Sequence, residues 1–289
     1  MIENKKSLKI LISLSMIIWG GSWVVSKYVT PFASVEILSF WRFLPTFLAF
    51  IPLLFLKKQK FVISKKSILL PLIAGFSMTL YMKVSFLGLQ NGYASAGGVI
   101  VTTLNPILTY IATFFLFKIV INKKDYFALF LATVGSIIMI DISNIEKLIC
   151  SGNLYFVLCA ICWVAVTINS QKSKEYFSPI LFSFFTFGFA TLFEYAFIYP
   201  APLFGDYMFK IDFWLAIFYL TIITNNFATT IFIIASSKLG SQSASSFIFI
   251  VPFSAFLFSY IFLNEPLDLN ILVGGVITLV AVYLLNKKI

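Results

Sequence analysis

Three charged side chains lie deep inside long apolar stretches of this chain, and they are the first residues that could carry chemistry. Arg42, the sole arginine of the sequence, falls about eight residues inside a stretch near 34–56. Lys83 lies about six residues from the end of a stretch near 67–89, and Glu194 about sixteen residues into a stretch near 178–200. If these stretches span a membrane, a charge at such depth normally faces a cavity or a partner and marks a functional site.

The chemistry of these three groups favours binding of a small charged solute. The planar guanidinium of Arg42 suits carboxylates, and Lys83 is expected at a similar depth because the two helices run in opposite directions. Glu194 is the natural counter-ion for either cation, and it could also bind a substrate ammonium or exchange a proton. The alternative is purely structural: Arg42 pairs with Glu36 or Glu194, and Lys83 extends to the membrane surface.

A second group of candidates consists of polar and aromatic residues near the middle of the apolar stretches. Indoles and amides at that depth need partners that lipid cannot provide, so we expect them to line a cavity. Packing within the helix bundle is the alternative for each tryptophan, and the paired asparagines either bridge helices or face water. The group contains Trp19, Tyr81, Thr102, Asn105, Trp163, Asn225 and Asn226.

Two prolines lie inside predicted helices. Pro106 and Pro252 each lack a backbone N–H, which releases the carbonyl four residues earlier, at Thr102 and Ile248, and kinks the helix. Small residues precede both prolines. We therefore expect two related helices that pack closely and bend, and we assign Pro106 and Pro252 a role in gating.

The elements that must position these residues are ten apolar stretches of roughly 18 to 25 residues, about the length of a membrane-spanning helix. With 60% hydrophobic and 11% charged residues among 289, the sequence predicts an all-α integral membrane protein with little room for a soluble domain. The predicted spans are 10–29, 34–56, 67–89, 93–117, 124–141, 151–171, 178–200, 212–236, 240–263 and 268–286.

The lysines fall in every second gap between these stretches. Sixteen of the 21 Lys and Arg residues lie on one predicted face, whereas the other face holds Lys27, Lys147 and Lys210 among acidic residues. The positive-inside rule then places both termini in the cytoplasm, which predicts a multi-pass protein of the bacterial inner (plasma) membrane. The net charge of +10 thus reflects orientation and predicts no nucleic-acid partner.

The chain also reads as two related halves, residues 1–145 and 146–289. An offset of 146 aligns Pro106 with Pro252 and the loop ending at Asn122 with that ending at Asp268, and an offset of 144 aligns Trp19 with Trp163. Because each half has five spans, the second enters the membrane from the opposite side. Such inverted-topology repeats are typical of secondary transporters that work by alternating access.

Several motifs carry a family resemblance. They are Trp19-Gly20-Gly21-Ser22, Arg42-Phe43, Ala94-Ser95-Ala96-Gly97-Gly98 through Leu104-Asn105-Pro106, Ser243-Ala244-Ser245-Ser246 through Pro252, and Asn264-Glu265-Pro266. In this order and spacing the chain resembles the EamA family of the drug/metabolite transporter superfamily over its whole length. The resemblance implies a ten-helix bundle of two EamA repeats around a central cavity, usually exporting amino acids or other small metabolites. Lys118-Ile119-Val120 departs from the usual Gly-Glu, and Cys162-Trp163-Val164 lacks an expected glycine.

Other classes of function find little support. The sequence has no nucleophile and base at a recognisable spacing, no phosphate-binding glycine loop and no nucleotide site, so we predict neither an enzyme nor an ATP-driven pump. Three cysteines and no histidine predict no metal site, and no cofactor is expected.

We therefore expect a secondary active transporter, most simply an exporter, of amino acids or other carboxylate-bearing metabolites. Arg42 and Lys83 would attract the carboxylate, and Glu194 the ammonium or a proton. Its expected partners are the solute, membrane lipid and protons or another coupling ion. Alternatives left open are an uptake permease for nucleoside-like metabolites, a carrier of hydrophobic cations, a lipid scramblase and a passive channel.

Overall fold

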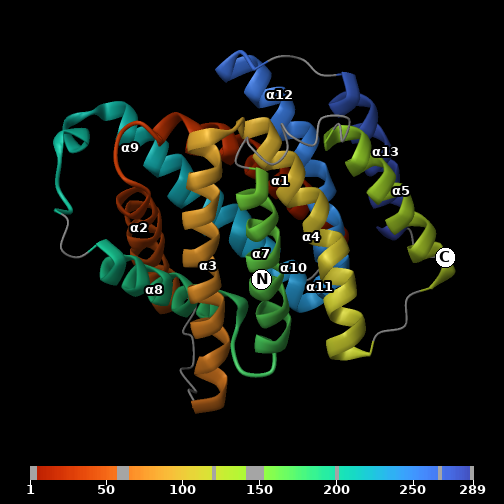
Figure 1. Ribbon diagram of the computed structural model, residues 1–289. Coiled ribbons are helices and arrows are strands. Elements are labelled where there is room, and N and C mark those ends of the chain that lie inside the picture. Colours follow the sequence, from red (N-terminus) through yellow and green to blue (C-terminus); the bar gives the residue numbers. More distant parts are fainter. Residues whose placement is uncertain are drawn as a thin grey trace.

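The computed structural model describes residues 5–56, 65–118, 122–140, 153–198, 202–265 and 269–286, and within them all regular structure is helical (Figure 1). The α-helices are α1 (Lys5–Val29), α2 (Val35–Leu56), α3 (Lys65–Asn91), α4 (Ala94–Phe117), α5 (Lys123–Ile140), α7 (Asn153–Ser173), α8 (Pro179–Ile198), α9 (Ile211–Phe218), α10 (Thr230–Leu239), α11 (Ser241–Ser245), α12 (Val251–Leu263) and α13 (Leu269–Asn286). Two 3₁₀-helices, η1 (Asp206–Phe209) and η3 (Ser246–Ile250), and a π-helix, η2 (Tyr219–Thr229), complete the set.

Each of the ten predicted stretches is helical in its described part, apart from the first residue of four of them: Ser34, Tyr93, Ser178 and Gly240. Eight of these helical segments are long and apolar enough to cross a membrane: Lys5–Val29, Val35–Phe55, Ser67–Asn91, Ala94–Phe117, Leu154–Ser173, Pro179–Ile198, Ile211–Leu239 and Ser241–Leu263. The described parts of α5 and α13 are not both long enough and apolar enough to cross a membrane by the same measure, so the count of ten spans stays a prediction.

The outer surface of the bundle is apolar. Large hydrophobic side chains such as Phe55, Phe115 and Phe209 are highly exposed. Soluble proteins rarely expose so much apolar surface to water. Lipid accepts such a surface, because hydrocarbon solvates these side chains well. The chain is therefore a multi-pass membrane protein with an all-helical membrane fold.

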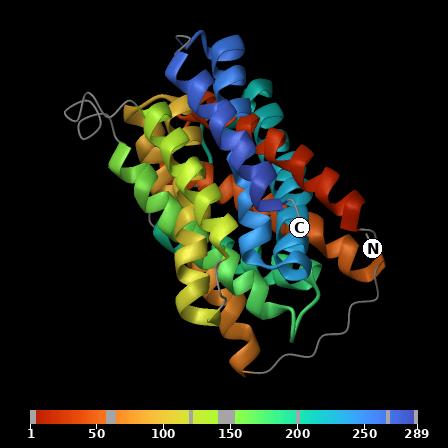
Figure 2. The same cartoon turned by 90° about the vertical axis from the view of Figure 1, so that its right-hand side faces the viewer.

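Helices from the first half of the chain pack against helices from the second half. α1 packs against α12 and η2, α2 against α8, and both α3 and α4 against α7 (Figure 1). α5 and α13 form a separate pair at one edge of the bundle (Figures 1 and 2). In this pair, a Cβ added at Gly135 would lie only 2.8 Å from the carbonyl oxygen of Gly274, which requires glycine for the close approach.

Two of the spans are irregular at mid-depth. The span Ile211–Leu239 contains the 11-residue π-helix η2, and the span Ser241–Leu263 contains the 3₁₀-helix η3 immediately before Pro252. π-Helical segments are rare and are frequently found at functional sites. Irregular backbone at membrane depth is tolerated only where protein buries it or where it lines a cavity. Both segments do contribute residues to the cavity described below.

Some of the expectations above fall on residues outside the described ranges. They include the boundary between the two halves at 145/146, Cys150, and the charged residues Asp141, Glu146, Lys147 and Asp268. Five of the lysines assigned to the cytoplasmic face also lie outside these ranges: Lys57, Lys58, Lys60, Lys287 and Lys288.

Candidate functional site

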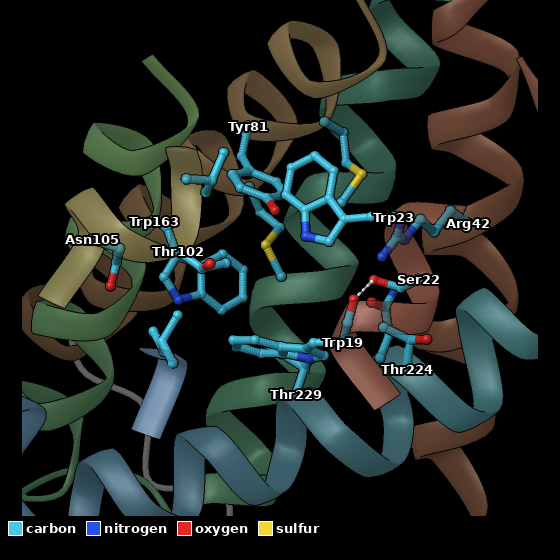
Figure 3. Close-up of a pocket in the computed structure, with 15 residues that line it drawn as sticks. Trp19, Ser22, Trp23, Arg42, Tyr81, Thr102, Asn105, Trp163, Thr224 and Thr229 are labelled. Carbon is cyan, nitrogen blue, oxygen red and sulfur yellow. Dashed lines mark hydrogen bonds between the residues drawn. The ribbon is translucent and has the colours of Figure 1, made fainter. Parts of the chain in front are cut away.

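A small cavity of about 40 Å³ lies in the middle of the bundle (Figure 3). Seven helical elements contribute residues to it: α1, α2, α3, α4, α7, η2 and η3. Its walls are Trp19, Ser22, Trp23, Arg42, Met78, Tyr81, Met82, Val101, Thr102, Asn105, Trp163, Thr224, Asn225, Thr229 and Ile248. A cavity of this size holds only a few water molecules, so a solute must widen it to enter.

The structure brings most of the sequence-predicted candidates together at this cavity. Seven of them line it: Trp19, Arg42, Tyr81, Thr102, Asn105, Trp163 and Asn225. Three others, Lys83, Glu194 and Asn226, are not among the lining residues. The predicted site is thus divided into a central group and a separate charged group on α2, α3 and α8.

Arg42 is the charged residue of the cavity wall. Its side chain is only 6% exposed, and its Nη1 donates a hydrogen bond to Ser26 Oγ at 3.0 Å. Its Nε has no hydrogen-bond partner, and within the described part of the chain no carboxylate forms a salt bridge with it. A buried cation without a counter-ion is costly, so this site favours an anionic ligand.

Aromatic rings form another part of the cavity wall. The rings of Trp19 and Trp163 meet edge to face with centroids 4.9 Å apart, and Tyr81 lies 5.3 Å from Trp163. The Nε1 of Trp19 donates to Thr229 Oγ1 at 3.3 Å, which holds α1 against η2. These contacts fix a rigid, amphipathic surface.

Three polar groups on the cavity wall have no hydrogen-bond partner among the described residues. They are Arg42 Nε, Trp163 Nε1 and Thr224 Oγ1, all buried. The first two can only donate hydrogen bonds, and the hydroxyl can donate as well. In Figure 3, Arg42, Ser22 and Thr224 lie on one side of the cavity, and Trp163, Thr102 and Asn105 on the other. The wall therefore offers donors at both ends to a ligand rich in acceptors.

The asparagines mainly connect helices. Asn105 Nδ2 donates to Ala160 O at 3.2 Å, which ties α4 to α7. Asn225 Nδ2 donates to Thr46 Oγ1 at 3.2 Å and Asn226 Nδ2 to Thr46 O at 3.0 Å, so both amides fasten the π-helix to α2. Both paired asparagines therefore bridge helices, and Asn225 also lines the cavity.

The charged residues outside the cavity form their own cluster. Lys83 Nζ lies 3.6 Å from Glu36 Oε1 and 3.9 Å from the centroid of the Phe197 ring. Glu194 is completely buried, and neither of its carboxylate oxygens has a hydrogen-bond partner among the described residues. The partner that the structure gives Lys83 is thus Glu36 and not Glu194.

The two prolines do not line the cavity, but each follows a lining residue by four positions. Pro106 lies inside α4 and Pro252 at the start of α12, just after η3. Thr102, whose carbonyl Pro106 releases, lines the cavity. Ile248 also lines it, but its carbonyl is not released as expected, because it accepts a hydrogen bond from Val251 N at the end of η3. The gating role of Pro106 and Pro252 stays a prediction.

Sequence reasoning missed several lining residues. Ser22, Trp23, Thr224 and Thr229 face the cavity, together with the apolar Met78, Met82, Val101 and Ile248. Ser22 belongs to the Trp19-Gly20-Gly21-Ser22 motif, and Thr224 and Thr229 flank the paired asparagines. Proximity to these motifs was the available signal. Small hydroxyl residues are common in helix packing, so their type alone is uninformative.

Metal-binding residues do not gather in the described ranges. No three His, Cys, Asp or Glu side chains there lie together in a way that could hold an ion. Cys159 and Cys162 are free thiols, and Cys159 Sγ lies 3.6 Å from the Tyr81 carbonyl oxygen.

Comparisons with known proteins agree with this architecture. The model of the EamA-like transporter family matches residues 7–141 and 150–287. An uncharacterized transporter of Archaeoglobus fulgidus is 24% identical over 96% of this chain and 97% of its own length. The uncharacterized transporter YetK of Bacillus subtilis is 25% identical over 93% of this chain and 84% of its own length.

More distant similarities extend to plants and to a known fold. A WAT1-related chloroplastic protein of Arabidopsis thaliana is 25% identical over 93% of this chain and 66% of its own length. A protein of known crystal structure superposes with a TM-score of 0.74 at 13% identity, covering 97% of both chains. At that identity the likeness supports the fold alone.

Proposed function

The chain belongs to the EamA-like transporter family, and on that premise we propose that it is a secondary active transporter exporting amino acids or other small carboxylate-bearing metabolites. Transport itself follows from the family. The substrate class, the direction and the mechanism are the proposal, and the central cavity is the proposed binding site.

The observation that carries the substrate class is the unpaired cation at Arg42. Its Nε lacks a partner, Thr224 Oγ1 also lacks one, and both face the same end of the cavity (Figure 3). No Asp or Glu is among the described residues that line the cavity. A substrate carboxylate would accept hydrogen bonds from these donors and neutralise the guanidinium.

The opposite end of the cavity suits the rest of an amino acid. Asn105, Thr102 and Trp163 offer polar groups there, and the rings of Trp19 and Trp163 offer faces to an ammonium group. The apolar Met78, Met82 and Val101 would contact an aliphatic side chain. The cavity measures about 40 Å³ in this conformation, so it must widen to admit such a solute.

Alternating access has support from the arrangement of the helices. α1 to α4 and the later elements α7, η2 and η3 together enclose the cavity, so relative movement of the two proposed halves, 1–145 and 146–289, would open it. The π-helix and the Pro252 segment supply irregular backbone next to the binding site, where bending is easiest.

The rival functions fit the cavity less well. A carrier of hydrophobic cations needs an available carboxylate in the cavity, and a scramblase needs a polar groove facing the lipid. The large lateral groove between α1, α9 and α12 is mostly apolar, with Asp212 as its charged residue. These observations favour a closed central site for an anionic group.

Direction and location complete the proposal. We place both termini in the cytoplasm of the plasma membrane because of the lysine distribution, and we propose export on the basis of the family. Inside-out membrane vesicles containing the protein should then accumulate a labelled amino acid under an ion gradient. Accumulation only by right-side-out vesicles would indicate uptake instead.

Thermal unfolding of the detergent-purified protein in the presence of single solutes tests the site. The panel contains amino acids, organic acids, nucleosides and quaternary amines. A bound ligand at a hundredfold excess over its dissociation constant adds about 2.7 kcal/mol of stability. We expect a carboxylate to stabilise the wild type fully. The same solute should stabilise Arg42→Lys only weakly, and Arg42→Ala not at all.

The control is Lys123→Ala, which removes one positive charge from an exposed position outside the cavity. Its response to the panel should equal that of the wild type. Stabilisation by quaternary amines alone, or a carboxylate effect that survives Arg42→Ala, would contradict the proposal.

A further inference from the structure

Glu194 is a buried acid that the central cavity does not use. It lies in α8, is completely inaccessible, and neither carboxylate oxygen has a hydrogen-bond partner within the described ranges. An ionised carboxylate in such a place would be very costly, since neither lipid nor a donor stabilises the charge. The arrangement therefore fits the neutral, protonated acid.

The register of α3 and α8 places a cation beside this acid. A Cβ added at Gly75 would lie 2.8 Å from Thr186 O, and Thr79 Oγ1 donates to Ala190 O at 3.4 Å. Lys83 is one helical turn beyond Thr79, and Glu194 is one turn beyond Ala190. Both residues thus lie at the same level of two adjacent helices.

Lys83 contacts one carboxylate and lies at the level of a second, Glu194. It currently pairs with Glu36 at 3.6 Å, in the first turn of α2, where the side chain of Glu36 is 35% exposed. The cluster therefore contains one cation for two acids, and one acid is left to bind a proton.

Other charged groups lie away from Glu194. α2 also carries Arg42, which hydrogen-bonds Ser26 at the cavity, and α3 also carries Tyr81, which lines the cavity. α7 and α10 pack against α8 as well, and their charged residues, Lys172 and Lys238, lie in the last turns of those helices. α8 itself adds Tyr195, which is exposed.

We propose that Glu194 is the proton-binding site that couples transport to a proton gradient, with Lys83 exchanging between Glu36 and Glu194 as the proton leaves and returns. When Glu194 is protonated, Lys83 pairs with Glu36, as observed. When the proton leaves, the carboxylate attracts Lys83, and Glu36 is left to be hydrated. This inference rests on the proposed function, because coupling presupposes a transported solute.

The exchange reaches the central cavity through two helices. The Lys83–Glu36 pair ties α3 to α2, and a Lys83–Glu194 pair would tie α3 to α8 instead. Arg42 lies on α2 within two turns of Glu36, and Tyr81 precedes Lys83 by two residues on α3. Changing the partner of Lys83 therefore changes the link between the helices that hold Arg42 and Tyr81.

Infrared spectroscopy of the purified protein tests the proton site without any substrate. A protonated carboxylic acid has a C=O stretching band that is lost on ionisation. We expect this band at neutral pH in the wild type, its loss in strongly alkaline buffer, and its absence from Glu194→Gln. The matched control is Glu265→Gln, because Glu265 is also buried but accepts hydrogen bonds from Ala94 N, Ser95 N and Ser95 Oγ.

In the control the band should remain as in the wild type. A second variant, Lys83→Met, removes the cation that stabilises ionised Glu194, so its band should persist to a pH higher by about one unit or more. Absence of the band in the wild type at neutral pH, or its survival in Glu194→Gln, would overturn the proton site.

Proteoliposomes test the coupling. With an equimolar mixture of the protein-forming amino acids, a pH gradient should drive net transport by the wild type, whereas Glu194→Gln should exchange labelled for unlabelled amino acids without responding to the gradient. Gradient-driven transport by Glu194→Gln would refute the coupling role. If the wild type moves no solute but shows the infrared band, the proposed substrate class is wrong and the proton site stands.

Discussion

At the scale of single residues, three buried charges are distinguished by their partners. Glu265 has three hydrogen-bond donors, Arg42 has Ser26 and an unpartnered Nε at a cavity, and Glu194 has no donor within the described ranges. Burial is nearly complete in all three cases. The satisfied group is structural, and the unsatisfied groups are the ones available to a solute or a proton.

Replacing Glu265 tests this distinction. Its Oε1 accepts from Ala94 N at 3.0 Å, and its Oε2 accepts from Ser95 N at 3.1 Å and Ser95 Oγ at 2.5 Å, at the positive end of α4. Glutamine has only one acceptor oxygen, so Glu265→Gln should lower the free energy of unfolding by about 1–3 kcal/mol. Thermal unfolding in detergent measures this loss.

The exposed Glu175→Gln serves as the control, because it removes the same charge from the turn after α7. Its midpoint of unfolding should not change. Equal stability of Glu265→Gln and the wild type would show that the carboxylate does not hold α4.

The same residues show how far the sequence predicts the site. Depth along a helix can be counted from the ends of an apolar stretch, and this identified Arg42, Trp19 and Asn105. The direction in which a side chain points depends on how each helix is rotated against its neighbours, and a nearly uniform apolar stretch does not encode that rotation. Lys83 and Glu194 were therefore counted among the cavity candidates because of their depth, but their side chains lie outside the cavity.

At the scale of elements, two turns with the same geometry lie 146 residues apart. Among the described non-glycine residues, Lys118 and Asn264 have positive φ, 52° and 53°, and they follow α4 and α12. This spacing equals the offset that aligns Pro106 with Pro252. It supports the proposed division into two repeats, because left-handed residues rarely recur by chance.

The two repeats differ in the residue that caps the start of one helix. Glu265 caps the start of α4 at Ser95, and the same offset pairs Glu265 with position 119 and Ser95 with Ser241. Position 119 is isoleucine, so the sequence provides no carboxylate there. Instead, the side chain of Gln171 accepts a hydrogen bond from Ser241 N at 2.6 Å. A neutral amide from α7 thus caps α11.

Gln171 should respond to substitution in both directions. Gln171→Ala leaves Ser241 N without its acceptor and should cost about 0.5–2 kcal/mol of stability, as the loss of a helix cap does. Gln171→Glu restores a negative charge at the helix start and should raise the midpoint of unfolding above that of the wild type. Thermal unfolding and amide hydrogen exchange over Ser241–Ser245 measure both effects. A Gln171→Glu protein less stable than Gln171→Ala would refute the cap.

At the scale of the whole molecule, the sequence predicts the elements better than their order in space. Apolar length alone predicted ten helical stretches, because a membrane span must satisfy its own backbone hydrogen bonds. It could not predict that α5 pairs with α13 at the edge, since contacts between such helices depend on small residues like Gly135 and Gly274 approaching one another. The π-helix was equally invisible, because its residues resemble those of any polar membrane helix.

Orientation in the membrane decides the direction of proton coupling, and it can be tested with two matched lysines. Lys210, before α9, and Lys174, after α7, are both exposed, and the lysine distribution places them on opposite faces. In a variant without Cys150, Cys159 and Cys162, an impermeant maleimide added to intact cells should label Lys210→Cys. It should label Lys174→Cys only after the membrane is opened. Since Glu36 begins α2 on the face of Lys210, this result would place the Glu36–Lys83–Glu194 cluster on the outer side, where a proton gradient directed inward delivers its protons. The reverse labelling would put the cluster on the cytoplasmic side, and export driven by inward proton flow would then need a different entry site.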